Sequence, residues 1–127
     1  MEFSIKSTSS NQELVLSNRD GEYFEARLNG VVTAHVLVYA YTDEQGLSKL
    51  FQELGGMEKP WGGNLSWESL EGEFKISASC SSLGEVQFNI LLWGLPGHPE
   101  EWRVNLGLVS ELGQLQQITK QAKRFFS

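Results

Sequence analysis

The segment VVTAHVLVYAYTDEQGLSKLFQELGG, residues 31–56, decides the fold class because it passes directly from one periodicity to another. From Val31 to Tyr41 the side chains alternate as in a β-strand, and both faces of this strand carry apolar residues. A helical spacing follows, in which the apolar stripe is formed by Leu47, Leu50, Phe51 and Leu54. The segment predicts a strand in the middle of a sheet, or one whose second face is open for a partner, followed by an amphipathic helix.

Local signals give the expected ends of this helix. Thr42 is expected to cap its N-terminus, and Gln45, three residues later, completes a capping box. Gly55 or Gly56 is expected to end it, because glycine commonly follows the last turn of a helix.

A second unit of the same kind closes the chain. The strand WRVNLGLV, residues 102–109, leads to a helix over residues 111–126 that Ser110 is expected to cap. A shift of 68 residues brings the two units into register. The matched pairs are Val36 with Val104, Val38 with Leu106, Ala40 with Leu108, Thr42 with Ser110, Leu47 with Leu115, Leu50 with Ile118, and Leu54 with Ala122. The register suggests two βββα-like halves, although any two strand-to-helix units of equal length would show it.

Five further alternating segments predict strands, and they lie near residues 2–7, 12–17, 23–30, 73–81 and 85–93. Turn signals at Asp20-Gly21 and Asn29-Gly30 separate the early ones. We therefore expect a single α+β domain over residues 1–127, with a mostly antiparallel sheet of about six to seven strands and two helices on one face.

The composition limits the classes of partner. The 127 residues carry a net charge of −6, so neither nucleic acid nor an anionic membrane surface is expected to attract the chain, whereas a basic protein partner is compatible with this charge. No apolar run approaches the roughly 18 residues that a membrane span needs. The first ten residues lack the apolar stretch of a secretory signal, which leads us to expect a cytoplasmic protein.

No catalytic or cofactor motif is visible in the chain. Cys80 lies in an alternating strand as a small core residue, and His35 and His98 have no second ligand at a metal-binding spacing. The sequence lacks the nucleophile elbow, the phosphate loop and the dinucleotide fingerprint. We therefore expect no enzyme activity, no catalytic residue, no metal and no cofactor.

The stretch EKPWGGNLSWESLEGEFKIS, residues 58–77, concentrates two of the four tryptophans between the first helix and the next strand. Trp61 and Trp67 could seal the end of the sheet, since each offers a large apolar surface. They could instead act as binding anchors, with Trp93 and Tyr39 joining them on one sheet face. The candidate binding residues are accordingly Tyr39, Trp61, Trp67 and Trp93.

The same stretch resembles the pattern of a family of small bacterial proteins that is classed as a domain of unknown function, with a signature of the type W-G-x(4)-W-x-S-x-E-G. The residues that carry the match are Trp61, Gly62, Trp67, Ser69, Glu71 and Gly72. The resemblance implies a compact bacterial α+β domain. Because the family has no established activity, it implies nothing about catalysis.

Three hypotheses follow. The first is a non-enzymatic intracellular module that presents one sheet face to a protein partner, as immunity proteins and antitoxins of similar size and charge do by analogy. The alternative is a small-molecule-binding domain or enzyme with a pocket between sheet and helices that joins Trp61, Trp67, His35 and Glu68. The third is a homodimer formed through the same apolar face.

Overall fold

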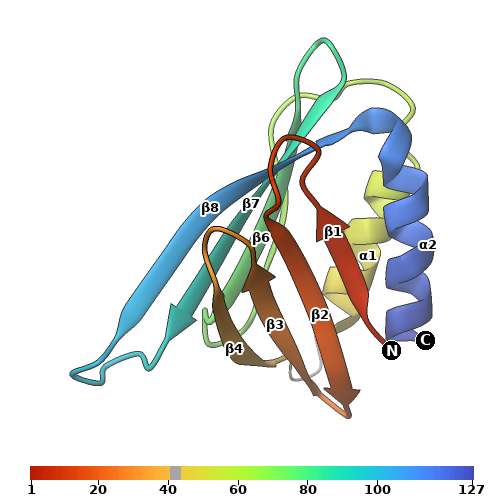
Figure 1. Cartoon of the computed structure of the whole chain (residues 1–127). Helices are drawn as coiled ribbons and strands as arrows, with labels where there is room; N and C mark the ends of the chain where they lie inside the picture. Colours follow the sequence, from red (N-terminus) through yellow and green to blue (C-terminus); the bar gives the residue numbers. More distant parts are fainter. Residues whose placement is uncertain (41–43) are drawn as a thin grey trace.

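The computed structural model describes residues 1–40 and 44–127 and shows an α+β fold with two antiparallel sheets, each followed by a helix (Figure 1). The first sheet has the order β1-β2-β3-β4 and the second the order β5-β6-β7-β8. The first half contains β1 (Phe3–Lys6), β2 (Glu13–Asp20), β3 (Tyr23–Asn29), β4 (Ala34–Tyr39) and α1 (Glu44–Gly55). The second half contains β5 (Leu65–Glu68), β6 (Phe74–Cys80), β7 (Glu85–Gly94), β8 (Trp102–Glu111), the short 3₁₀ helix η1 (Leu112–Gln114) and α2 (Leu115–Phe126).

The expectation of one sheet with about six to seven strands is wrong, because the described residues form two four-stranded sheets. The strand missed is β5, which has only four residues and one buried side chain, Trp67. So short a strand leaves too little alternation to detect. The alternation also marks which side chains face inward without saying which sheet the strand joins.

Strand β4 lies at the edge of its sheet and not in the middle, as one of the two expectations had it. Its two apolar faces suggested a strand in the middle of a sheet, but β4 lies at the end of the order β1-β2-β3-β4. Val36 and Val38 are buried on the inner face. On the outer face Leu37 is 59% exposed, so the other alternative, a face open to solvent, describes this strand.

The core lies between the inner faces of the two sheets and the two helices. Phe24 of β3 meets Phe74 of β6 edge to face, with ring centroids 6.2 Å apart, and so joins the two sheets. Phe3 of β1 meets Phe51 of α1 in the same manner at 4.9 Å. Burying rings of this size supplies much of the apolar area that stabilises the fold.

The helices lie side by side on one side of the molecule (Figure 1). The hydroxyl of Thr119 in α2 donates a 2.6 Å hydrogen bond to the carbonyl of Phe51 in α1. These two residues are 68 positions apart, the shift that relates the two halves in the sequence. A methyl group on Gly55 would come within 2.5 Å of the same hydroxyl, so the glycine permits the close crossing.

The helix ends agree only in part with the expectations. Helix α1 ends at Gly55, as expected, while the capping box of Thr42 and Gln45 involves side chains outside the described part of the chain. Ser110 does not cap a helix. It pairs with Val86 inside the sheet, and β8 continues to Glu111 before the chain turns into η1. Within the described residues, no helix is long and apolar enough to cross a membrane.

The two sheets meet along one side and diverge along the other. The N–H of Thr8 donates a 2.9 Å hydrogen bond to the carbonyl of Val109, which ties the end of β1 to β8. At the opposite ends of β7 and β8, the hairpin reaches beyond the strands of the first sheet (Figure 1). Trp102 and Val104 are therefore only half-buried, although they share the inner face of β8 with the fully buried Leu108.

Candidate functional site

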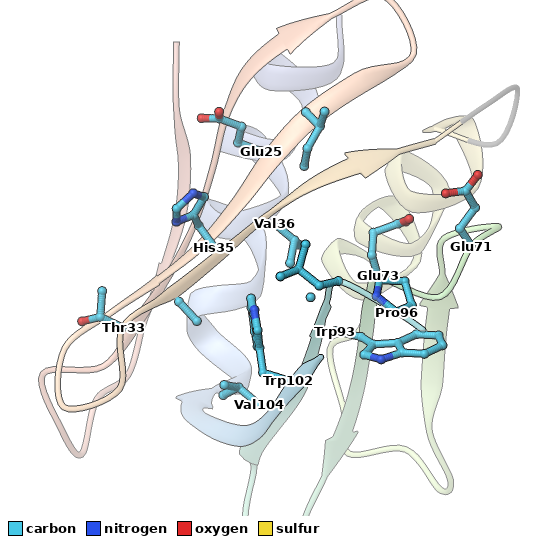
Figure 2. A pocket seen from close by; sticks show the side chains of 14 residues that line it. Glu25, Thr33, His35, Val36, Glu71, Glu73, Trp93, Pro96, Trp102 and Val104 are labelled. Atoms are coloured by element: carbon cyan, nitrogen blue, oxygen red, sulfur yellow. The ribbon is translucent and has the colours of Figure 1, made fainter. Parts of the chain in front are cut away.

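An open groove of about 850 Å³ lies between β4 and the projecting β7–β8 hairpin (Figure 2). Its walls come from four parts of the chain, namely β3 and β4, the segment before β6, the end of β7 and the start of β8. The lining residues are Glu25, Thr33, Ala34, His35, Val36, Leu37, Glu71, Glu73, Trp93, Gly94, Leu95, Pro96, Trp102 and Val104.

Trp102 and Val104 form the apolar wall of the groove. Trp102 stands opposite Gly94 in the β7–β8 pairing, and its indole ring covers the glycine. A methyl group on Gly94 would clash with Cε2 of that ring, far inside van der Waals contact. Only a glycine leaves the room that this ring position requires.

Trp93 is held between two neighbours of its own chain. The guanidinium of Arg103 lies over the ring at 4.6 Å from its centroid, which is cation–π geometry. A methyl group on Gly72 would come within 3.4 Å of the ring's Cζ3 atom. The indole Nε1 is buried and has no hydrogen-bond partner among the described residues. Trp93 thus lines the groove while much of its surface is already in contact.

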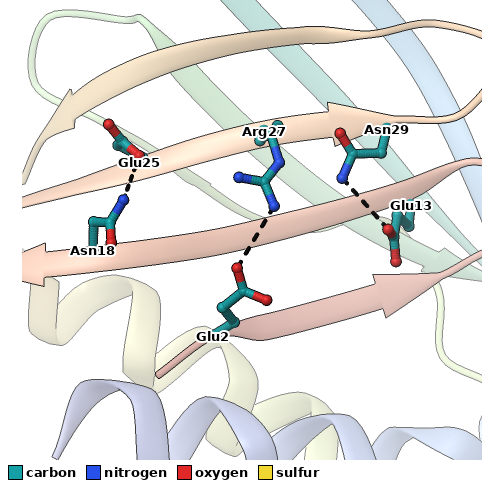
Figure 3. A network of polar contacts seen from close by, with 6 residues as sticks. All are labelled: Glu2, Glu13, Asn18, Glu25, Arg27 and Asn29. Atoms are coloured by element: carbon teal, nitrogen blue, oxygen red, sulfur yellow. Dashed lines mark hydrogen bonds and ion pairs between the residues drawn. The ribbon is translucent and has the colours of Figure 1, made fainter.

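The titratable side chains of the groove are three carboxylates and one imidazole, and no lysine or arginine is among its described lining residues. Glu25 is oriented by Asn18, whose Nδ2 donates a 2.7 Å hydrogen bond to its Oε2 (Figure 3). Asn18 can reach it from an irregularity in the β2–β3 pairing, where its backbone takes a positive φ of 52°. The groove therefore presents a negative surface.

Glu73 is the most perturbed of these groups. Burial raises the pKa of its carboxyl group above the ordinary 4.5, and the neighbouring charge of Glu71 acts in the same direction. Hydrogen bonds from the Ser69 side chain and from the backbone N–H groups of Glu73 and Tyr39 oppose this rise in pKa. One carboxyl oxygen, Oε1, is buried without a hydrogen-bond partner among the described residues. The carboxyl group of Glu73 is thus held in place, and its surroundings make the ionised form less favourable than it is in water.

Comparison with known proteins places the chain in a family. The model of the Family of unknown function (DUF6228) matches residues 6–127. The chain belongs to this family. The match includes all of both helices and seven of the eight strands, which confirms the resemblance to a domain of unknown function. No curated protein matches the chain, and no solved structure does. Membership in DUF6228 therefore brings no known activity.

The structure does not bring the four candidate binding residues of this DUF6228 chain together. Trp93 lines the groove, whereas Trp67 is 7% exposed and packs against Phe74 with ring centroids 6.1 Å apart. Trp61 is half-buried and packs against the core. Tyr39 stacks on Tyr23 at 4.8 Å. Trp61 and Trp67 thus both contribute to packing.

The pocket imagined for the alternative hypothesis is not formed as expected. Of its four residues, His35 lines the groove, and Trp61, Trp67 and Glu68 do not. Cys80, expected in the core, is half-buried at its edge, and its thiol contacts the carbonyl of Ser81 at 3.4 Å.

Sequence reasoning did not select Trp102, Val104, Glu25 or Glu73 as site residues, although all four line the groove. The alternation of β8 placed Trp102 and Val104 inward, where burial was the natural expectation. The sequence carried no usable signal, because it predicted a longer strand over residues 31–41 than over residues 102–109, whereas in the structure β8 has ten residues and β4 has six. Inward side chains that extend past a shorter opposing strand are only partly covered.

Proposed function

We propose that this protein is a non-enzymatic binding module that receives a basic segment of a partner protein in the groove between β4 and the β7–β8 hairpin. The observation that carries the proposal is the combination, in one open groove, of three carboxylates with the half-buried apolar wall of Trp102 and Val104.

Charge supports a basic partner. Glu25, Glu71 and Glu73 line the groove without a lysine or arginine among its described lining residues, and the whole chain carries a net charge of −6. An arrangement of this kind attracts Lys and Arg side chains and repels acidic ones, which sets specificity and speeds encounter. The exposed part of the Trp102 ring in the apolar wall adds a further preference for cations.

Apolar exposure supports a protein partner. Leu37 is 59% exposed and Leu95 is 50% exposed at the rim of the groove, next to the half-buried Trp102. A half-exposed tryptophan surrounded by aliphatic and polar groups is the common composition of a binding hot spot. We place the module inside a bacterial cell, in the manner of immunity proteins and antitoxins, by analogy of size and charge.

The proposal is tested by affinity capture from a lysate of the source organism at low and high salt, read by mass spectrometry. The bait variants are Trp102→Ala, which removes the apolar wall, and Glu25→Lys, which reverses one groove charge. Matched controls are Leu83→Ala, which truncates a 95% exposed side chain that does not line this groove, and Glu53→Lys, which makes the same charge change on α1.

We expect one stoichiometric basic protein to be retained by the wild type and both controls, and to be lost with Trp102→Ala and Glu25→Lys. High salt should weaken its capture, because the interaction is partly between charges. Capture of the same protein by all five baits, or of none by the wild type, would overturn the proposal.

A small-molecule ligand is the second candidate, favoured by the size of the groove. About 850 Å³ falls within the roughly 300–1,000 Å³ that ligand pockets occupy. Thermal-shift screening of anionic, neutral and cationic metabolites would support this candidate if only cationic compounds raised the melting temperature of the wild type and not that of Glu25→Lys. Light scattering tests the homodimer, which a monomeric mass rules out.

A further inference from the structure

We infer that the partner segment binds as an added β-strand along the free edge of β4, with side chains that alternate between apolar and basic. This inference rests on the proposed function and names the conformation and chemistry of the ligand that the groove takes. Addition of a strand to an exposed sheet edge is a general mode of peptide recognition in which backbone hydrogen bonds supply affinity and alternate side chains supply specificity.

The groove runs along β4. Five consecutive residues, 33–37, line it. Successive side chains of a strand point to opposite faces of the sheet, so a cavity on one face would be lined by every second residue. Lining by the whole run therefore means that the groove follows the strand edge itself, as Figure 2 shows for Thr33, His35 and Val36.

The backbone N–H and carbonyl groups of β4 point alternately towards β3 and towards the free edge. The N–H of Ala40 donates a 2.8 Å hydrogen bond to the carbonyl of Glu22 in the β3–β4 pairing. In an antiparallel pair every second residue turns both its N–H and its carbonyl towards the neighbouring strand. Ala34, Val36 and Val38 therefore also face β3, whereas His35, Leu37 and Tyr39 turn their backbone groups to the free edge.

Glu73 marks one end of this edge. Its carboxyl group accepts a hydrogen bond from the backbone N–H of Tyr39, which agrees with an outward direction of the backbone groups at odd-numbered positions. The next outward-facing positions are Leu37 and His35, and both line the groove. Together they offer two N–H donors and two carbonyl acceptors to an added strand.

The other three edge strands of the described sheets are β1, β5 and β8, and their free edges are protected. Exposed edges are usually protected by shortness, by charged side chains or by a covering segment. β1 and β5 have four residues each and carry Lys6 and Glu68. β8 carries Arg103, and its Val109 is hydrogen-bonded to the segment after β1.

β4 lacks these protections along its described length. Its six residues are AHVLVY, without lysine, proline or any carboxylate, and its outward Leu37 is 59% exposed. A sheet edge of this composition is prone to pair with another strand. The difference between β4 and the other edges is what favours a strand-shaped ligand here.

The surroundings of β4 determine the side-chain pattern that the ligand needs. On the inner side of an added strand, alternate side chains would lie against Trp102 and Val104, which suits apolar residues. On the outer side they would lie beside Leu37, whose partner across β3–β4 is Glu25. Two strand spacings are about 10 Å, within reach of the long side chains of Lys or Arg and their carboxylate partner. The ligand is thus an extended segment with alternating apolar and basic residues.

The experiment selects binders from a library of random dodecapeptides displayed against the full-length wild-type protein. We expect enriched sequences to alternate between apolar and basic residues. The strongest binder is then synthesised in two forms, with N-methyl groups on its odd or on its even positions, and titrated by calorimetry. Only the register that faces β4 should weaken binding, by about tenfold or more, because methylation removes the donors to the edge carbonyls.

Protein variants provide the complementary measurement. Leu37→Pro removes an outward-facing N–H from an edge strand, where proline is tolerated, without removing a hydrogen bond to β3. We expect it to weaken peptide binding by about tenfold, whereas Leu37→Thr, which keeps the N–H, should weaken it by less than about threefold. If Leu37→Pro does not fold, the two N-methylated peptides decide the question with the wild-type protein.

The outcomes separate this inference from the proposed function. Peptides whose binding is lost with Trp102→Ala and Glu25→Lys, but is equally insensitive to both N-methylation registers, would overturn strand addition and leave the groove as a binding site. A library that yields no binder, or binders unaffected by either groove variant, would overturn both. Enriched peptides without basic residues would overturn the proposed ligand chemistry.

Discussion

Gly94→Ala tests whether the position of Trp102, and with it the shape of the groove, depends on the absence of a side chain at residue 94. The new methyl group would clash with Cε2, Nε1 and Cζ2 of the Trp102 ring. Favourable carbon contacts begin near 3.5 Å, so the ring must move by about 1.5 Å or swing into the groove.

The expected cost combines two opposing effects. Overpacking of this kind destabilises by about 1–3 kcal/mol. Replacing glycine by alanine also lowers the conformational entropy of the unfolded chain, which stabilises the folded protein by about 0.4–1 kcal/mol. We therefore expect Gly94→Ala to lower the free energy of unfolding by about 1–2 kcal/mol, and the moved Trp102 to weaken binding of any ligand of the groove.

Urea denaturation of the wild type, Gly94→Ala, Trp102→Ala and the double variant measures the coupling between the two residues. In the Trp102→Ala background the clash is absent, so Gly94→Ala should be neutral or slightly stabilising. The control Gly62→Ala places a methyl group where no atom lies within 4 Å, and should change stability by less than about 0.5 kcal/mol. An equal loss from Gly94→Ala in both backgrounds would refute this account of the groove wall.

Three further predictions concern the scaffold. Gly55→Ala brings a methyl group within 2.5 Å of the Thr119 hydroxyl and should destabilise by about 1–3 kcal/mol in urea unfolding, while Thr119→Ser should relieve part of that loss. Glu73 has its pKa raised in the folded state, so its contribution to stability is fully present below 4.5 and is lost as the pH rises through the raised value. The stability of the wild type relative to Glu73→Gln should accordingly fall as the pH rises above 4.5, and a flat difference would count against the raised pKa. The buried side-chain amide of Gln12 donates to the carbonyls of Asn29 and Val32 at 2.9 and 2.7 Å, so Gln12→Glu, which presents an oxygen to them, should cost about 2–4 kcal/mol at neutral pH and less at acid pH by the same assay.

The fold class could be read from local patterns because each pattern reports a neighbourhood of a few residues. The alternation around Val36 and Val38 predicted a strand but not which of its two apolar faces is buried, whereas the stripe of Leu47, Leu50, Phe51 and Leu54 predicted the buried face of α1. Gly55 ended the helix as expected. Each of these features depends on contacts that repeat with the period of the strand or helix.

The division into two sheets was not predictable in the same way. Alternation says that Phe24 and Phe74 point inward, but not that they point at each other from different sheets. The 68-residue register relates the two strand-to-helix units, and the hydrogen bond between Thr119 and Phe51 joins residues at that separation. It did not give the strand order, since pairing partners depend on chain path rather than on local pattern.

The candidate site is the feature that the sequence predicted least well. The sequence by itself determined that Trp67 and Trp102 both offer large apolar rings, with Trp102 in an alternating strand and Trp67 in the segment between the first helix and the next strand. Only the tertiary structure decided that Trp67 is buried and that Trp102 lines an open groove. The physical reason is that exposure of an inward side chain depends on whether an opposing strand reaches far enough to cover it, and β4 ends before the start of β8 is covered.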